Sequence, residues 1–254
     1  MILIDDPLFY LVALAAVSLL GISKGGFFGL GVMALPLMSL YVPPLQAAAI
    51  IIPTMLAQDA LTIWAYRKTW SAWNLKIMIP SMTIGIVVGT LFAASLSAAH
   101  IRLTVGLIAG AFVLKQWLGN RFDRLALRSN TTTGVVFGAV GGFTTLLANA
   151  GGPAWQMHLL PQGLDKLTYA GTLTMLFAAS NVIKIPAYGS LGQLTWGNLV
   201  IGLILIPVAV LANYAGLWLV RRTSTEAFFR IAYVLMFLVA CELIRGASLE
   251  LLRG

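Results

Sequence analysis

Three long stretches of the chain carry almost no charge. Residues 25–66 contain only Asp59 among charged residues, and residues 129–164 and 185–220 contain no Asp, Glu, Lys or Arg. A helix needs roughly 20 apolar residues to cross a bilayer, and each stretch is longer than that. The stretches lack the alternating pattern of outer-membrane strands, so helices are the elements that can pair their backbone groups in lipid. The sequence therefore predicts an all-α polytopic membrane protein.

Composition agrees with a lipid environment. The 254 residues are 59% hydrophobic and 9% charged, whereas soluble domains carry about 25% charged residues. The net charge of +8 does not indicate a nucleic-acid partner, because the basic residues flank apolar runs and form no contiguous patch. One cysteine excludes a disulfide framework, and two separated histidines match no metal spacing. We expect no cofactor and no metal. The sequence shows no cluster of reactive side chains, so it does not predict an enzyme.

Breaks between the apolar runs divide the chain into helices. Two blocks, residues 8–42 and 131–161, are interrupted by glycine-rich segments at 23–26 and 149–153. A straight helix of about 35 residues would measure roughly 52 Å, and the hydrocarbon core is roughly 30 Å thick. Length therefore predicts a bend in the first block, and the orientation derived below predicts that each block is a helical hairpin. The other runs predict helices at 44–66, 75–96, 99–118, 164–188, 196–220 and 224–244.

The two halves of the chain resemble each other. Collinear matches of this kind predict a two-fold repeat, with residues 1–118 as the first transmembrane repeat, 119–132 as a basic linker and 133–254 as the second repeat. The matching pairs are Gly25-Gly26-Phe27 with Gly141-Gly142-Phe143, Thr54-Met55-Leu56 with Thr174-Met175-Leu176, Asn74-Leu75 with Asn198-Leu199, Pro80 with Pro207, and Gly89 with Gly216.

Basic residues predict the orientation, because cytoplasmic loops are enriched in Lys and Arg. When the loop after residue 66 is placed in the cytoplasm, eleven of the 16 basic residues lie on that side. The first hairpin then opens outside and the second inside, and three crossings follow each hairpin. Because three is odd, we expect the second half to be an inverted copy of the first, as in many secondary transporters. The eleven residues are Arg67, Lys68, Lys76, Lys115, Arg121, Arg124, Arg128, Lys166, Arg221, Arg222 and Arg230.

Both hairpin tips carry glycines where a new helical arm begins, and Pro153 suits the first position of the second return arm. A helix that starts inside the membrane has unpaired N–H groups and a positive dipole end, which bind an anion if a cavity is present. Alternatively, the glycines serve close helix packing and Lys24 reaches the headgroups. The expected substrate-binding residues are Lys24, Gly25, Gly26, Gly29 and Gly31 in the first tip, and Asn149, Gly151, Gly152 and Gln156 in the second.

Asp59 is the one acidic residue within these apolar stretches. A carboxylate in a membrane indicates a proton relay or the partner of a buried base, although a structural hydrogen bond is the alternative. Its mate in the second half is Asn181, and we expect Lys184, one turn further, to anchor the outer end of its helix. Gln58 and Ser180 flank this pair and would line the same cavity or bond between helices. We expect His158 to be a packing residue.

These motifs together resemble the TauE/SafE family of sulfite exporters and related anion permeases, over roughly residues 8–245. The resemblance implies transport of a small sulfur oxyanion such as sulfite, or of an organosulfonate, across the bacterial inner membrane. It rests on two similar repeats around a basic linker, on the run Pro43-Pro44-Leu45-Gln46-Ala47, and on the glycine-rich start of each half, Gly25-Gly26-Phe27 through Gly29-Leu30-Gly31 and Gly141-Gly142 through Gly151-Gly152-Pro153.

The leading functional hypothesis is an alternating-access carrier that holds a small anion between the two tips, with Asp59 coupling protons. A passive anion channel and a carrier of a non-sulfur carboxylate are the alternatives, and a channel would differ because its flux does not saturate. The expected partners are the substrate anion and the lipid bilayer, with no nucleic acid. The sequence leaves open whether the chain forms a homo-oligomer.

Overall fold

The computed structural model describes residues 4, 6–24, 30–118, 129–219 and 225–253, and this part of the chain is helical with no strand. Short connections join the helices. The elements are α1 (Pro7–Lys24), the 3-10 turn η1 (Leu30–Met33), α2 (Ala34–Met38), α3 (Pro44–Tyr66), α4 (Ala72–Ala94), α5 (Ala98–Leu118), α6 (Thr131–Ala148), α7 (Gly151–Leu159), the 3-10 turn η4 (Leu160–Gln162), α8 (Lys166–Ser190), α9 (Trp196–Leu219) and α10 (Thr225–Arg253).

Within the described segments, six helices are long and apolar enough to cross a membrane, namely α1, α3, α4, α5, α6 and α9. This confirms the expectation of an all-α polytopic membrane protein. Helix α8 has 25 residues and is long enough to cross at 1.5 Å per residue, but it is not one of the six. Its lower hydropathy comes from polar side chains that are buried inside the bundle, which are Thr172, Thr174, Ser180, Asn181 and Lys184.

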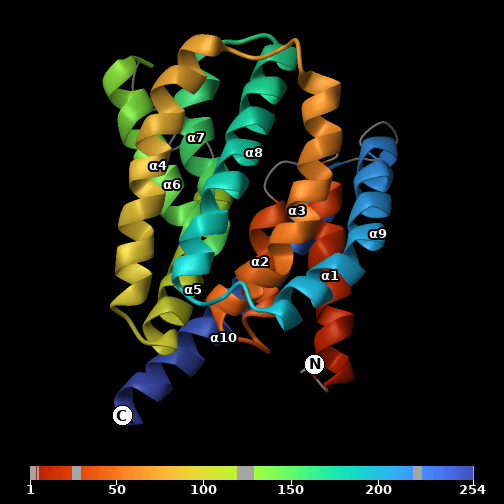
Figure 1. Cartoon of the computed structure of the whole chain (residues 1–254), viewed down its shortest axis with the longest axis vertical. Helices are drawn as coiled ribbons and strands as arrows, with labels where there is room; N and C mark the ends of the chain where they lie inside the picture. The colour runs from red at the N-terminus through yellow and green to blue at the C-terminus, as the bar shows by residue number, and fades with distance from the viewer. Residues whose placement is uncertain (1–3, 5, 25–29, 119–128, 220–224, 254) are drawn as a thin grey trace.

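Two interrupted helices enter the bundle from opposite ends. In Figure 1 the start of α1 and the connection from α2 to α3 lie at the lower end, whereas the start of α6 and the connection from α7 to α8 lie at the upper end. Helix α7 has nine residues, which span roughly 13 Å, less than half of a hydrocarbon core of roughly 30 Å. The turn between α6 and α7 therefore lies inside the bundle.

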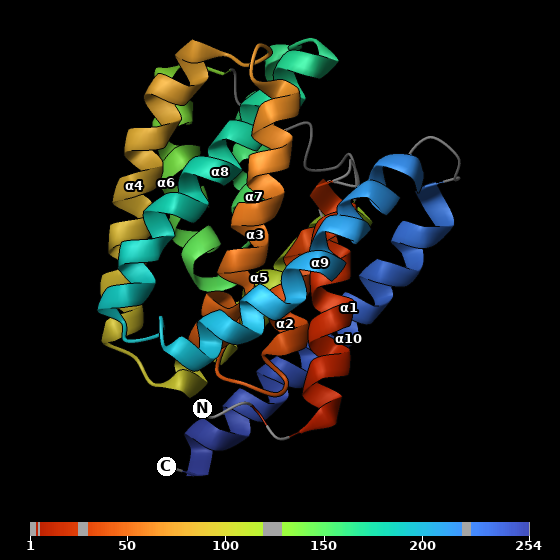
Figure 2. The same ribbon diagram turned by 45° about the vertical axis from the view of Figure 1, so that its right-hand side comes forward.

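Small residues let helices from different parts of the chain approach closely, as is usual in membrane bundles. Helix α4 packs on α6, and α1 packs on α9; Figure 2 shows α9 crossing α1 obliquely. A Cβ added at Gly85 of α4 would lie 2.0 Å from the carbonyl oxygen of Ala139 in α6. A Cβ added at Gly216 of α9 would lie 2.7 Å from the Cα of Ile22 in α1. Neither contact would admit a side chain.

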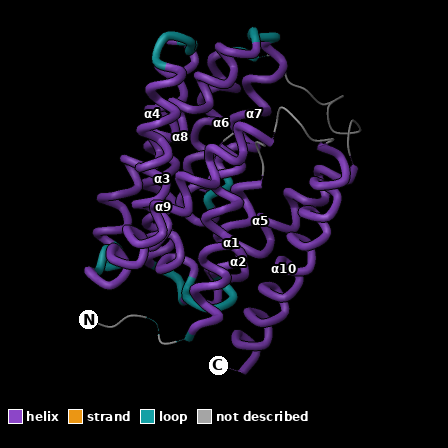
Figure 3. The backbone as a smooth tube through the Cα atoms, turned by 90° about the vertical axis from the view of Figure 1, so that its right-hand side faces the viewer, coloured by secondary structure: helices purple, strands orange, loops and turns teal. Residues whose placement is uncertain are grey.

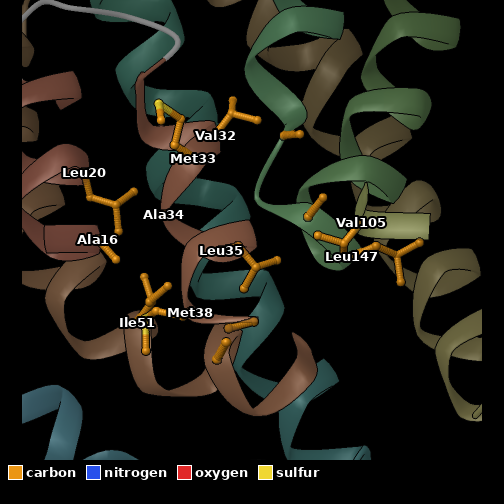
Figure 4. Packing of buried hydrophobic residues seen from close by; sticks show 14 of the residues in the cluster. Ala16, Leu20, Val32, Met33, Ala34, Leu35, Met38, Ile51, Val105 and Leu147 are labelled. Carbon is orange, nitrogen blue, oxygen red and sulfur yellow. The ribbon is translucent and has the colours of Figure 1, made fainter. Parts of the chain in front are cut away.

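The first return arm is the centre of the apolar core. Leu35 and Met38 of α2 are fully buried, and Figure 4 shows them between Ala16 of α1, Ile51 of α3 and the Leu147 region of α6. Burial of these side chains stabilises the arm by about 1.5–3 kcal/mol each relative to exposure in water. Against lipid the gain is smaller, because packing replaces the hydrophobic effect there. The arm is therefore held mainly by close contact.

Outside the two hairpins, most helix boundaries lie within two residues of those expected from sequence, and two differ by more. Helix α4 begins at Ala72 instead of residue 75, because Ser71 caps it by accepting a hydrogen bond from the backbone N–H of Asn74. Helix α10 continues to Arg253 instead of residue 244. Ala247 is fully buried there, and Figure 3 shows α10 along one edge of the bundle, where it packs on α5.

Candidate functional site

One cavity lies between the two hairpin tips. Its volume is about 50 Å³, and because one water needs about 10–15 Å³ on the same measure, it holds a few waters or a small ion. The walls come from α1, η1, α3, the second tip and α8. The lining residues are Leu20, Ser23, Lys24, Gly31, Val32, Met55, Asp59, Thr62, Asn149, Gly152, Pro153, Gln156, Thr174 and Phe177.

Lys24 brings a cation to this cavity as the last residue of α1. A lysine is favourable at that position because the helix C-terminus carries partial negative charge. Its ammonium forms an ion pair with Oδ1 of Asp59 and donates a hydrogen bond to the carbonyl oxygen of Met55 at 3.2 Å. The side chains of Lys24 and Asp59 are 12% and 5% exposed. Removing one partner of an ion pair this shielded strongly destabilises the folded protein, because the other charge is left buried without a partner.

Asp59 also connects α3 to the second half. Its Oδ2 accepts a hydrogen bond of 2.6 Å from Nδ2 of Asn181 on α8, so both carboxylate oxygens have a described partner. Asn181 is itself fully buried. The pair predicted from the repeat, Asp59 and Asn181, is therefore in direct contact, and the carboxylate is fixed between the first tip and α8.

The second tip joins a helix end to a helix start. Helix α6 stops at Asn149, whose φ of 51° is left-handed, and α7 begins at Gly151. Pro153 is thus the third residue of α7, whereas the sequence had suggested that it would be the first. The first-turn N–H groups of Gly151 and Gly152 have no acceptor within their helix, and Gly152 lines the cavity. This tip therefore contributes backbone donors and the positive end of a helix dipole.

Lys184 differs most from its expected role. It was expected to anchor the outer end of its helix, but it is fully buried, and its Nζ donates to Oδ1 of Asn149 at 2.7 Å. Lys184 follows Asn181 by three residues on α8, so both side chains lie on one face of that helix. Helix α8 thus contacts Asp59 with one residue and the second tip with the other. The two lysines and one aspartate connected here leave a formal excess of one positive charge.

The cavity brings together many of the residues predicted from sequence. Lys24, Gly31, Asp59, Asn149, Gly152 and Gln156 line it, whereas Gly25, Gly26 and Gly29 lie outside the described residues. Gly151 and Asn181 adjoin lining residues without lining the cavity themselves. Gln58 and Ser180 are also absent from the lining, because Nε2 of Gln58 bonds to the carbonyl of Ala209 at 3.0 Å and Oγ of Ser180 bonds to that of Phe177 at 2.7 Å.

Sequence reasoning missed the lining residues Ser23, Met55, Thr62, Thr174 and Phe177. For two of them a signal was present, because Met55 and Thr174 belong to the tripeptide repeated in both halves. That repetition was used to align the halves and not to predict the site. Ser23, Thr62 and Phe177 carried no comparable pattern.

His158 lies outside the cavity and forms part of a separate polar cluster. Its Nδ1 is 3.0 Å from Oγ1 of Thr133, and its Nε2 is 3.0 Å from Oδ1 of Asn74. Gln162 joins the same cluster by donating to Oδ1 of Asn74 at 2.9 Å. These bonds confirm that His158 is a packing residue whose polar atoms are paired. The cluster attaches the second hairpin to the start of α4.

Interrupted helices that meet at a polar cavity inside a helical membrane bundle are typical of membrane transporters. The chain matches the family model described as sulfite exporter TauE/SafE over residues 13–243, and it therefore belongs to that family of membrane transporters. The family match confirms the resemblance seen in the sequence motifs. No match was found among curated proteins or among solved structures.

Proposed function

We propose that the protein is a secondary carrier that binds a small anion in the cavity between its two tips. The anion is a sulfur oxyanion such as sulfite, or an organosulfonate. The observation that carries this proposal is that Lys24 of the first tip and Asn149 and Gly152 of the second line one cavity. The family match adds the sulfur chemistry, because its description is that of a sulfite exporter.

The donors around the cavity suit an oxyanion better than a cation or a neutral solute. The ammonium of Lys24 has three hydrogens, and its contacts with described residues use two of them. The start of α7, where Gly152 also lines the cavity, offers backbone N–H groups and a positive dipole end. An anion with oxygens on two sides would accept from both. Its negative charge would also offset the formal positive charge left by the two lysines and Asp59.

The second half is proposed to be an inverted copy of the first, with 1–118 and 133–254 as the repeats. Two hydrogen-bonded pairs support this relation. Asn74, near the start of α4, bonds to Gln162 of the second half through Nδ2 and Oε1 at 2.9 Å. Its sequence mate Asn198, near the start of α9, accepts from Nε2 of Gln46 of the first half at 3.1 Å. Each half thus uses an asparagine at the corresponding position to contact a glutamine of the other half.

Helix contacts follow the same exchange. If α1, α3, α4 and α5 correspond to α6, α8, α9 and α10, then the contact of α1 with α9 corresponds to that of α6 with α4. The contact of α3 with α9 likewise corresponds to that of α8 with α4, and the contacts α3 with α8 and α5 with α10 map onto themselves. Each hairpin therefore packs on a helix of the other repeat. A rocking motion between the repeats would open the cavity to each side in turn.

Asp59 is proposed to couple the anion to a proton. Its carboxylate and an incoming anion compete for the ammonium of Lys24, so protonation of Asp59 would release Lys24 to the anion. The charged groups around this carboxylate are Lys24 on α1 and Lys184 on α8, and the neutral Asn181 donates to its other oxygen. Transport would then move the anion together with a proton.

The loops at the upper end of Figure 1 are proposed to face the cytoplasm of a bacterial cell, with the bundle in the inner membrane. The described loop at that end carries Arg67 and Lys68, and basic residues favour the cytoplasmic side. Residues 119–128 of the basic linker at 119–132, which include Arg121, Arg124 and Arg128, lie outside the described residues.

Flux measurements in proteoliposomes test the proposal. The purified protein is reconstituted, and the uptake of sulfite, thiosulfate, an alkylsulfonate and acetate is followed over a range of concentrations and pH. We expect saturable flux of a sulfur oxyanion that increases with an inward proton gradient. Flux that rises linearly with concentration would indicate a channel, and saturable flux of acetate alone would indicate a carboxylate carrier. No flux of any of the four anions would overturn the proposal.

A further inference from the structure

Asn149 is unusual in both its backbone and its side chain. It is the one non-glycine residue with a positive φ, 51°, in the described part of the chain. Asparagine tolerates this left-handed conformation better than most residues, although it still carries some strain. The residue is 6% exposed and lines the cavity between the tips. A buried polar residue held in this conformation next to a cavity calls for a physical reason.

Lys184 determines which way the amide of Asn149 points. The ammonium of Lys184 has only donors, so it must face the amide oxygen, as the 2.7 Å contact with Oδ1 requires. The amide nitrogen lies in the same plane as the oxygen but on the opposite edge of the carboxamide, away from Lys184. Nδ2 of Asn149 is buried and has no hydrogen-bond partner in the described residues. A buried NH₂ group left unpaired is destabilising, unless an acceptor occupies the neighbouring cavity.

The start of α7 places further donors beside this amide. Gly151 and Gly152 follow Asn149 by two and three residues, and the N–H groups of a first helical turn have no partner within the helix. Gln156, one turn further along α7 from Gly152, also lines the cavity and adds a side-chain amide. Neutral donors of the second tip therefore line the same cavity as Lys24.

We propose that Asn149 binds the transported anion directly through Nδ2, and that Lys184 is a positioning residue that orients the amide for this contact. The inference rests on the proposed function and adds how the second tip recognises its substrate. The ligand is an oxyanion with at least two acceptor oxygens, one for the amide and helix start of the second tip and one for the ammonium of Lys24. Lys184 itself does not touch the anion, because its hydrogen bond to Asn149 lies on the far side of the carboxamide.

The first variant to test is Asn149→Asp. One carboxylate oxygen would pair with Lys184, so folding is retained or strengthened, while the other would replace the unpaired NH₂ group that is proposed to bind the anion. Binding of sodium sulfite is measured by calorimetry under argon on the purified full-length protein, and thermal unfolding is recorded in parallel. We expect no detectable sulfite binding and an unfolding temperature at or above that of the wild type. Sulfite binding equal to the wild type would overturn the proposal.

A double-mutant cycle separates positioning from long-range attraction. Asn149→Gly keeps the left-handed backbone but removes the amide, and we expect sulfite binding about ten- to a hundredfold weaker. Lys184→Met should weaken binding about tenfold in the wild-type background. In the Asn149→Gly background it should have no further effect, because the group it orients is gone. An equal loss in both backgrounds would show that Lys184 acts on the anion as a charge and would overturn its positioning role.

Two outcomes remain to be assigned. If Lys184→Met does not fold, the two Asn149 variants decide the proposal. Glycine fits the left-handed backbone and aspartate can pair with the buried Lys184, so both variants should fold. If the wild type binds none of sulfite, thiosulfate or an alkylsulfonate, the proposed function itself fails. If the wild type binds sulfite and Asn149→Asp binds it equally well, only the assignment of Asn149 fails.

Discussion

The two hairpin tips meet at one cavity but use different chemistry. The first tip ends a helix with Lys24, whose charge is matched by Asp59. The second tip begins a helix, and the side chain beside that helix start is the neutral Asn149. Its Oδ1 accepts a hydrogen bond from Nζ of Lys184. In the first tip a cation faces the cavity and can exchange one anionic partner for another. In the second tip the lysine does not line the cavity, whereas the neutral residues Asn149, Gly152 and Gln156 do.

This difference suggests separate tasks for the two tips. A lysine and a carboxylate form a pair whose balance depends on protons, so the first tip is suited to coupling. Backbone N–H groups and an oriented amide have no charge state to change, so the second tip is suited to selecting the shape of the anion. Helix α8 contacts Asp59, the ion-pair partner of Lys24 in the first tip, through Asn181, and it contacts the second tip through Lys184. A movement of α8 would therefore affect the two tips together.

The largest effect is expected from Gly152→Leu in the second tip. A Cβ at this position would already lie 2.9 Å from Cζ of Phe177, and the rest of the leucine would fill the cavity. We expect flux of sulfite to fall to that of protein-free vesicles, whereas membrane insertion is retained because leucine favours helix. Gly246→Leu in α10 is the matched control, because nothing lies within 4 Å of its Cβ position. Normal flux in Gly152→Leu would remove the second tip from the substrate path.

Lys24→Met tests the cation of the first tip. Asp59 would be left as a buried charge without its ammonium, which destabilises a protein by about 3–5 kcal/mol. We therefore expect a lower unfolding temperature and no sulfite binding. The double variant Lys24→Met/Asp59→Asn should recover the unfolding temperature but not the binding. Recovery of both would show that the lysine serves stability alone.

The sequence alone was enough to predict the membrane class, the positions of nearly all helices and the two interrupted hairpins. Those features follow from local patterns, namely uncharged runs broken by glycines. It also indicated that Asp59 and Asn181 are mates in the repeat. The contact between them depends on how α3 and α8 pack, and the sequence did not predict it.

Lys184 could not be placed in the same way. A lysine one turn from a helix end reads as a headgroup anchor, because isolated charge is expensive in lipid. Its burial depends on the position of Asn149, 35 residues away in the chain, and on a left-handed turn that no composition rule predicts. Likewise, the roles of Met55 and Thr174 in lining the cavity follow from tertiary packing. Local sequence patterns thus predicted where the two tips lie. Which polar groups pair around them, such as Lys184 with Asn149, depends on tertiary contacts.

Asp59→Asn tests the proposed difference in proton dependence between the tips. Without a carboxylate to compete for Lys24, sulfite should bind about tenfold more tightly near neutral pH, or by about 1.4 kcal/mol. The rise of wild-type flux with acidity should also be lost. Binding measured by calorimetry and flux measured between about pH 5 and 8 check both expectations. An unchanged pH profile would exclude Asp59 from coupling.

Asp165→Asn is the matched control for that experiment. Asp165 caps α8 at an exposed position, and hydrogen bonds from the side chain and backbone of Thr168 hold the pKa of its carboxyl below the usual value. Its contribution to stability is therefore present above the ordinary pKa of aspartate and is lost as the pH falls through the lowered one. Asparagine also caps helices. The variant should keep the wild-type pH profile of flux, which would show that an acid-sensitive cap does not explain the profile.

Asn74→Ala and Asn198→Ala compare the halves away from the cavity. Asn74 exchanges hydrogen bonds with Gln162 and contacts His158, so its loss should lower the free energy of unfolding by about 2–3 kcal/mol. Asn198 bonds to Gln46 and to the carbonyl of Gln193, and its loss should have a smaller effect of about 1–2 kcal/mol. Denaturation in detergent measures both. The half-saturating sulfite concentration should change in neither variant, and a change in either would mean that these pairs act on the site.

The smallest effect is expected where a charge pair lies outside the contact between the tips. Arg102 of α5 and Glu250 of α10 are 2.8 Å apart, with side chains that are 27% and 55% exposed. Solvent screening limits such pairs to about 0–1 kcal/mol, so Arg102→Gln should change the free energy of unfolding by no more than that. The buried Ala247, and not the ion pair, would then hold the last turns of α10 on the bundle. A loss of about 3 kcal/mol or more would contradict this prediction, because the exposed pair would then matter as much for stability as the shielded pair of Lys24 and Asp59.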